Sequence, residues 1–144
     1  AAQWAKVALL RRLLRLALGE GDLQEAARYV WLPTHWDFKE LQWLCWLDAD
    51  ALVVDHDTQL QDFTQYPQIE FVISEDMSCA SEVNTGVMLV HVSHWSLKLL
   101  DEAWSCPTRF HHGPFHEQSA LCQVLQRRHP AQPPGSDWWW SWRG

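Results

Sequence analysis

Basic residues are scarce in this chain. Its 144 residues include eleven lysines and arginines against eighteen aspartates and glutamates, which gives a formal net charge of −7. Affinity for nucleic acid comes mainly from cationic side chains that meet phosphates, so we expect no nucleic-acid partner. The charge does not exclude a nucleotide ligand that is bound through a metal ion, because the ion then supplies the positive charge.

Long apolar runs and an initiating methionine are also missing. No stretch reaches the ~20 consecutive apolar residues that a helix needs to span a bilayer. Arginines interrupt the apolar run near the N-terminus, so that run does not fit a signal peptide. Because the first residue is Ala, we expect the chain to be a piece of a longer protein, with any membrane anchor outside it.

The four cysteines lack the Cys-x-x-Cys spacing of a zinc site. Cys45 lies in a predicted strand and Cys122 on a predicted helix, so both are expected to be core thiols. Cys79 and Cys106 lie in predicted loops and could pair in an oxidising compartment. Four of the eleven tryptophans occupy core-type positions, where packing is their expected role: Trp43, Trp46, Trp95 and Trp104.

Apolar periodicity predicts an alternation of helices and strands. Helical spacing covers residues 4–18, 93–104 and 117–126. Extended apolar runs end at residue 48, cover residues 68–74 and follow residues 84–86. This order predicts an α/β domain over residues 1–128, with a mainly parallel sheet and flanking helices. Residues 129–144, rich in Pro and Trp, predict an irregular tail. Lys6 could approach a phosphate, but the default expectation is an exposed lysine of the first helix.

The most informative stretch is residues 43–54, which read WLCWLDADALVV. Alternate side chains of a strand point to one face, so Asp48 and Asp50 are expected to project together from the end of a buried strand. Two such carboxylates form half of an octahedral site for Mn²⁺ or Mg²⁺, which could neutralise a diphosphate leaving group. The alternatives are a plain acidic turn and a second Asp-x-Asp at Asp55 and Asp57.

Four motifs follow one another along the chain: WLDADALV, NTGVMLV, HWSLKLLDEAW and HEQSAL, preceded by Trp-Ala-Lys at residues 4–6. In this order the chain resembles glycosyltransferase family 34, which includes α-galactosyltransferases, α-mannosyltransferases and xyloglucan xylosyltransferases. The resemblance implies a partial GT-A fold and a Golgi lumenal enzyme of type II membrane topology. It also implies a retaining hexosyl- or pentosyltransferase that moves a sugar from a UDP- or GDP-sugar donor to a glycan acceptor, with Mn²⁺.

The same resemblance assigns roles to donor-binding residues. Asp48 and Asp50 match the aspartates that bind the metal and the diphosphate. Asn84, Thr85 and Gly86 match the sugar-binding side of the cleft. These assignments come from the matched motifs and not from the spacing of the residues alone.

Two catalytic candidates come from the last motif. Glu117 and Gln118 match an acidic–Gln pair near the reacting sugar, where an oxygen could stabilise the positive charge that develops as the diphosphate leaves. Without the resemblance, Glu117 is simply an acidic residue in the first turn of a helix, which the helix dipole favours.

Two other functions stay open. A GT-A domain begins with strands that hold the nucleotide base and ends with a His-x-x-Gly segment, and this sequence has neither. We therefore expect only the central part of such a domain, inactive by itself, and a catalytically silent fragment or binding module is the first alternative. The second is a metal-dependent hydrolase built on Asp48, Asp50 and a loop histidine, with candidates at His111, His112 and His116.

Overall fold

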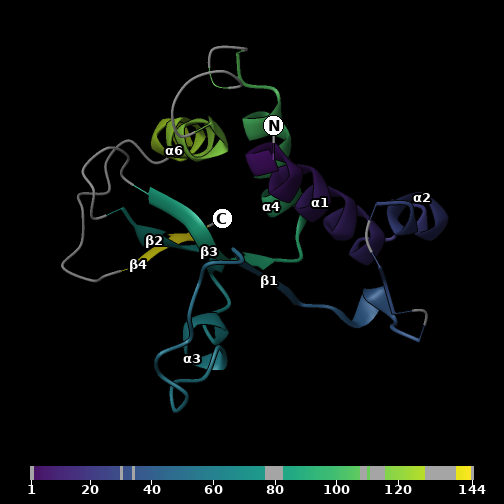
Figure 1. The fold of residues 1–144 in the computed structure, drawn as a ribbon, viewed down its shortest axis with the longest axis horizontal. Coiled ribbons are helices and arrows are strands. Elements are labelled where there is room, and N and C mark those ends of the chain that lie inside the picture. The colour runs from purple at the N-terminus through teal and green to yellow at the C-terminus, as the bar shows by residue number, and fades with distance from the viewer. Residues whose placement is uncertain are drawn as a thin grey trace.

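The computed structural model describes residues 2–29, 31–33, 35–76, 83–107, 110, 116–128 and 139–143. The chain contains both helices and strands, which confirms a mixed α/β structure, but the two do not strictly alternate (Figure 1). Their order is α1 (Ala2–Ala17), α2 (Leu23–Ala27), η1 (Phe38–Glu40), β1 (Trp43–Leu47), α3 (Gln61–Thr64), β2 (Ile69–Glu75), β3 (Val83–His91), α4 (His94–Trp104), α6 (His116–Arg128) and β4 (Trp139–Arg143).

The strands form one sheet in the order β1-β3-β2-β4, and every described pairing is antiparallel. The prediction of a mainly parallel sheet is therefore wrong for these strands. Only residues 76–82 join β2 to β3, and a parallel crossover needs a connection of a dozen or more residues. β1 and β2 do run in the same direction, but β3 lies between them.

Helices α1, α4 and α6 cover one face of the sheet (Figure 1). Their apolar stripes and the facing side of the strands form the main core, in which Leu14, Leu100 and Met88 are completely buried. A smaller cluster of Ile69 and Leu89 with their neighbours lies apart from it, packed against Phe63 of the α3 segment. The apolar run VMLV in β3 thus contributes side chains to both apolar clusters. A continuous apolar run of this kind is more typical of a strand in a parallel sheet, which is buried on both faces.

Local signals account for the ends of the helices. α1 stops before Gly19, whose φ of 76° is the left-handed conformation that favours glycine after a helix. Ser93 caps α4, because its side chain accepts a hydrogen bond from the backbone N–H of Ser96 at 3.2 Å. These ends confirm the helices predicted over residues 4–18 and 93–104. None of the described helices is long and apolar enough to cross a membrane.

Several apolar residues near β1 and α4 are exposed. Residues 51–54, which read ALVV, form an open segment in which Leu52 and Val54 are each 82% exposed. Cys45, expected to be a core thiol, is exposed, whereas Cys122 packs against the main core as expected. Trp104 is 37% exposed and packs edge-to-face on the Trp4 ring. Cys79 lies outside the described residues, so its pairing stays a prediction.

The C-terminal tail contains a strand where the sequence predicts irregular structure. β4 pairs antiparallel with β2 and forms one edge of the sheet. Strand formation there follows from the run WWSWR, because aromatic residues favour extended backbone. The division into a domain over residues 1–128 and a tail over residues 129–144 stays a prediction.

The first prediction concerns the stability that the core beneath the helices provides. Leu100→Ala removes a completely buried side chain from the core and should lower the free energy of unfolding by about 2–5 kcal/mol. Leu52→Ala makes the same chemical change at a position that is 82% exposed, and should change it by less than about 0.5 kcal/mol. Urea unfolding of both variants measures the difference, and equal effects would contradict the core described here.

Candidate functional site

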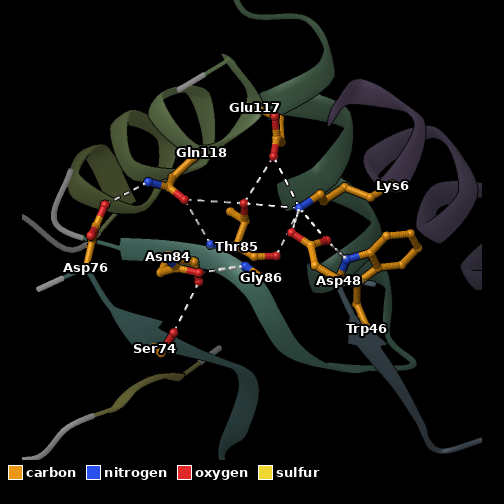
Figure 2. A network of polar contacts seen from close by, with 10 residues as sticks. All are labelled: Lys6, Trp46, Asp48, Ser74, Asp76, Asn84, Thr85, Gly86, Glu117 and Gln118. Carbon is orange, nitrogen blue, oxygen red and sulfur yellow. Dashed lines mark hydrogen bonds and ion pairs between the residues drawn. The ribbon is translucent and has the colours of Figure 1, made fainter. Parts of the chain in front are cut away.

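Four segments that are far apart in the sequence meet at one polar cluster (Figure 2). α1 contributes Lys6, the end of β1 contributes Asp48, β3 contributes Thr85 and α6 contributes Glu117. The helices place two of these side chains above the sheet, and the strands present the other two from below. The cluster therefore lies between the helical layer and the sheet.

Lys6 is the centre of the cluster. Its Nζ lies 2.8 Å from Asp48 Oδ1 and 3.4 Å from Glu117 Oε1, and it donates to the Thr85 carbonyl oxygen at 3.2 Å. The residue is only 6% exposed, so the expectation of an exposed lysine is wrong. The sequence spacing could have indicated this burial, because Lys6, Leu10 and Leu14 follow one another at intervals of four residues and therefore share one helix face, which is buried.

Asp48 is held from two sides. Lys6 donates to its Oδ2 at 2.9 Å, and the Trp46 indole N–H donates to its Oδ1 at 2.6 Å. Its own backbone N–H donates to the Gly86 carbonyl at 2.8 Å. Partial burial acts to raise the pKa of the Asp48 carboxyl, but the hydrogen bonds from Lys6 and Trp46 and the Lys6 charge together hold that pKa below its ordinary value of 3.8. Asp48 is therefore a fixed carboxylate.

Asp50 differs from Asp48 in its surroundings. It lies in a turn beyond the end of β1 and is exposed. Within the part of the chain that the structure describes, its carboxylate has neither a hydrogen bond nor an ion pair. Because the strand ends at Leu47, the strand alternation used to pair the two aspartates does not extend to Asp50. One carboxylate is thus committed to the protein, and its neighbour is open to solvent.

Asn84 and Gly86 lie in the first residues of β3 and are joined by a local hydrogen bond. The Asn84 side-chain oxygen accepts a hydrogen bond from the Gly86 backbone N–H at 2.8 Å. A Cβ added at Gly86 would lie 2.9 Å from that oxygen and 3.7 Å from Asp48 Oδ2. A side chain at this position would push the Asn84 amide away from its contact, which explains glycine here.

Glu117 and Gln118 both contact Thr85. The Thr85 hydroxyl donates to Glu117 Oε1 at 3.1 Å, and the Thr85 backbone N–H donates to Gln118 Oε1 at 3.1 Å. The amide nitrogen of Gln118 donates to Asp76 Oδ2 at 3.0 Å. Glu117 is 3% exposed, and its second oxygen, Oε2, is buried without a hydrogen-bond partner among the described residues.

The second Asp-x-Asp has a structural role. Asp55 accepts hydrogen bonds from the Asp57 backbone N–H at 2.9 Å and from the Thr58 hydroxyl at 2.6 Å. The Thr58 hydroxyl, followed by the two backbone N–H groups, lowers the pKa of the Asp55 carboxyl. This is the self-capped turn that aspartates commonly form, and it lies outside the Lys6 cluster.

Within the described ranges, no three His, Cys, Asp or Glu side chains converge to hold a metal ion. His111 and His112 lie outside those ranges. His116 begins α6 with a φ of 34°, and its Nδ1 is buried without a hydrogen-bond partner among the residues described. A metal at Asp50 would therefore need further ligands from substrate, from water or from residues that are not described.

Comparison with known proteins finds similarity to plant enzymes. The chain is 30% identical over 114 residues to proteins called "Probable glycosyltransferase 3" in Oryza sativa subsp. indica and Oryza sativa subsp. japonica. The chain is therefore similar to probable glycosyltransferases. The match covers 73% of this chain but only 19% of each rice protein, so the chain spans about a fifth of the length of these relatives. No family model matches the chain, and no solved structure matches it.

The second prediction concerns the contribution of the buried Lys6 ammonium group to stability. Lys6→Met keeps a long apolar side chain but leaves the buried Glu117 carboxylate without its cation, which should lower the free energy of unfolding by about 3–5 kcal/mol. Lys39→Met removes the same charge from an exposed residue of η1 and should have little effect. Chemical denaturation of the two variants provides the measurement. A small loss for both would show that the Lys6 contacts are not formed in solution.

Proposed function

We propose that this chain is part of a retaining glycosyltransferase that moves a sugar from a nucleotide-diphosphate donor to a glycan acceptor, with assistance from Mn²⁺ or Mg²⁺. One observation carries the proposal: an exposed carboxylate, Asp50, stands beside a buried cluster that fixes Asp48, Thr85 and Glu117 around Lys6. The relationship to the rice proteins supports glycosyl transfer in general. The donor, the metal and the retention of configuration belong to the proposal.

The carboxylates fit a hard divalent cation. Mn²⁺ and Mg²⁺ prefer anionic oxygen ligands. The exposed carboxylate of Asp50 offers such a ligand, and no described side chain contacts it. Asp48 retains free lone pairs, although Lys6 and Trp46 already use both of its oxygens. A bound cation would supply neutralisation of the charge on a departing diphosphate. Asp50 would be its principal protein ligand, with Asp48 beside it.

Lys6 and Trp46 position Asp48. Two donors on different elements fix the carboxylate before any substrate arrives, so binding need not restrict its rotation. Lys6 also supplies a positive charge close to the candidate diphosphate position. Asn84, which accepts a hydrogen bond from the Gly86 N–H, is exposed at the edge of the same cluster. A donor sugar could contact its side chain there.

In this proposal Glu117 and Gln118 act on the face of the donor sugar that is opposite the departing diphosphate. In the substrate-free structure Gln118 holds the backbone of Thr85, and Glu117 holds both its hydroxyl and the Lys6 ammonium. The negative charge of Glu117 favours positive charge nearby, and a sugar that loses its diphosphate develops such charge. Oε2 of Glu117 is the oxygen of this pair that no donor among the described residues uses.

A direct assay separates this proposal from its alternatives. The protein that contains this chain is incubated with a panel of UDP- and GDP-sugars, Mn²⁺ and oligosaccharide acceptors, and the anomeric configuration of any product is read by NMR. Transfer with retained configuration supports the proposal. Donor binding without transfer indicates a silent binding module, and phosphoester cleavage without transfer indicates a hydrolase.

The metal assignment gives the third prediction. Asp50→Asn should lower Mn²⁺-dependent transfer at least about a hundredfold, because it removes an anionic ligand from a hard-cation site. Asp57→Asn makes the same change at an exposed aspartate of the second Asp-x-Asp and should be mild. Mn²⁺ titration followed by electron paramagnetic resonance should show weaker binding only in Asp50→Asn. The opposite pattern would transfer the metal role to the second motif.

The α6 pair gives the fourth prediction. Glu117→Gln and Gln118→Ala should lower kcat by a larger factor than they change KM for the donor, as groups that act mainly in the transition state do. Thermal unfolding provides the control, because both side chains also hold Thr85. Variants that lost thermal stability and kept full kcat would show that the pair is purely structural.

A further inference from the structure

The side-chain amide of Gln118 is held at both of its ends (Figure 2). The Thr85 backbone N–H donates to Gln118 Oε1 at 3.1 Å, and Gln118 Nε2 donates to Asp76 Oδ2 at 3.0 Å. Gln118 lies on α6, Thr85 on β3 and Asp76 directly after the last residue of β2, so the amide joins the helical layer to the sheet. Gln118 is 9% exposed and Thr85 is 2% exposed. The described residues therefore enclose this contact by themselves.

The two partners of Gln118 fix which way round its amide lies. A backbone N–H can only donate a hydrogen bond, so Thr85 selects the oxygen end of the amide. A carboxylate accepts hydrogen bonds, so Asp76 selects the nitrogen end. A rotation of the amide by 180° would set donor against donor at Thr85 and acceptor against acceptor at Asp76. The amide thus has one favourable orientation.

An irregularity in the sheet frees the N–H that holds the oxygen end. Ser74 of β2 pairs with Asn84, although the residue before it pairs with Met88, so the β2–β3 ladder skips three residues of β3. Thr85 is the first of these three, and its N–H donates to Gln118 instead of to β2. Such irregularities re-aim groups of a strand and are over-represented beside active sites. The break in the ladder thus lets β3 contact α6 through its backbone.

We propose that Asp76 is a positioning residue for sugar transfer, because it fixes the Gln118 amide beside Glu117. This inference rests on the proposed function, in which Gln118 acts near the reacting sugar. The Thr85 hydroxyl donates to Glu117 Oε1 at 3.1 Å, so Thr85 supports both members of the pair. Thr85 reaches only the oxygen end of the Gln118 amide, and Asp76 supplies the contact at the nitrogen end. Misplacing an aligned group costs rate even where no contact to substrate is lost.

Kinetics of the complete protein that contains this chain tests the role in the reaction. Asp76→Leu removes the acceptor at similar size and should lower kcat at least about tenfold, with a smaller change in KM for the donor. Asp76→Asn keeps an accepting oxygen and should retain most of kcat. Glu75→Leu removes the same charge from the adjacent exposed residue and should leave kcat unchanged. Circular dichroism checks that each variant is folded at the assay temperature.

NMR of protein labelled with ¹⁵N in its glutamines measures the amide without any reaction. The Gln118 side-chain signals are identified by their absence in Gln118→Ala. Exchange of these amide protons with solvent should be at least about tenfold faster in Asp76→Leu than in Asp76→Asn or Glu75→Leu.

The two readouts separate the possible failures. Unchanged exchange in Asp76→Leu would overturn the positioning role whatever the reaction. Faster exchange with an unchanged kcat would also overturn it, because the contact would then be structural only. Faster exchange in a protein that transfers no sugar even without substitution would refute the proposed function instead.

Reversing the direction of the bond gives a test that does not need Asp76→Leu to fold. Gln118→Glu places two carboxylates at the contact and should lower the melting temperature by about 5 °C or more. Combining it with Asp76→Asn supplies an amide N–H to the new carboxylate and should recover at least about half of that loss, which is a non-additive result. Melting temperatures of the two single variants and the double variant provide the measurement. Strictly additive effects would overturn the proposal.

Discussion

The buried ammonium group of Lys6 is the interaction on which the rest of the site depends. Moving an ammonium ion out of water costs several kcal/mol, and only close oxygen atoms can offset that cost. Here the oxygens come from Asp48, Thr85 and Glu117, which lie on three other elements. α1, β1, β3 and α6 must therefore all be in place for the cation to be tolerated. This requirement couples the packing of the helices on the sheet to the geometry of the candidate site.

A second consequence is that the two aspartates of the Asp-x-Asp motif have separate tasks. Asp48 is fixed by Lys6 and Trp46 and faces the interior, whereas Asp50 faces solvent from a turn. A fixed carboxylate orients its surroundings, and an open one can bind a cation from solution. The proposed function rests on this division of roles, and the similarity to the rice proteins called "Probable glycosyltransferase 3" supports only glycosyl transfer in general.

Much of the local structure could be predicted because local chemistry sets it. Ser93 before a periodic apolar run defined the start of α4, and Gly19 defined the end of α1. The direction of the strands was predicted wrongly, because a doubly buried run such as VMLV is typical of parallel sheets and is also produced when two apolar clusters flank an antiparallel one. The short link between β2 and β3 was the better indicator.

The sequence by itself determined the helices, the strands and the candidate polar residues, since periodicity, capping and motif order are properties of neighbouring residues. Only the tertiary structure decided that Lys6 is buried, that Asp76 contacts Gln118, and that residues 51–54 are exposed. The physical reason is that burial and charge pairing depend on which elements pack together. A lysine on a helix looks the same in sequence whether its ammonium meets water or oxygens contributed by three distant segments.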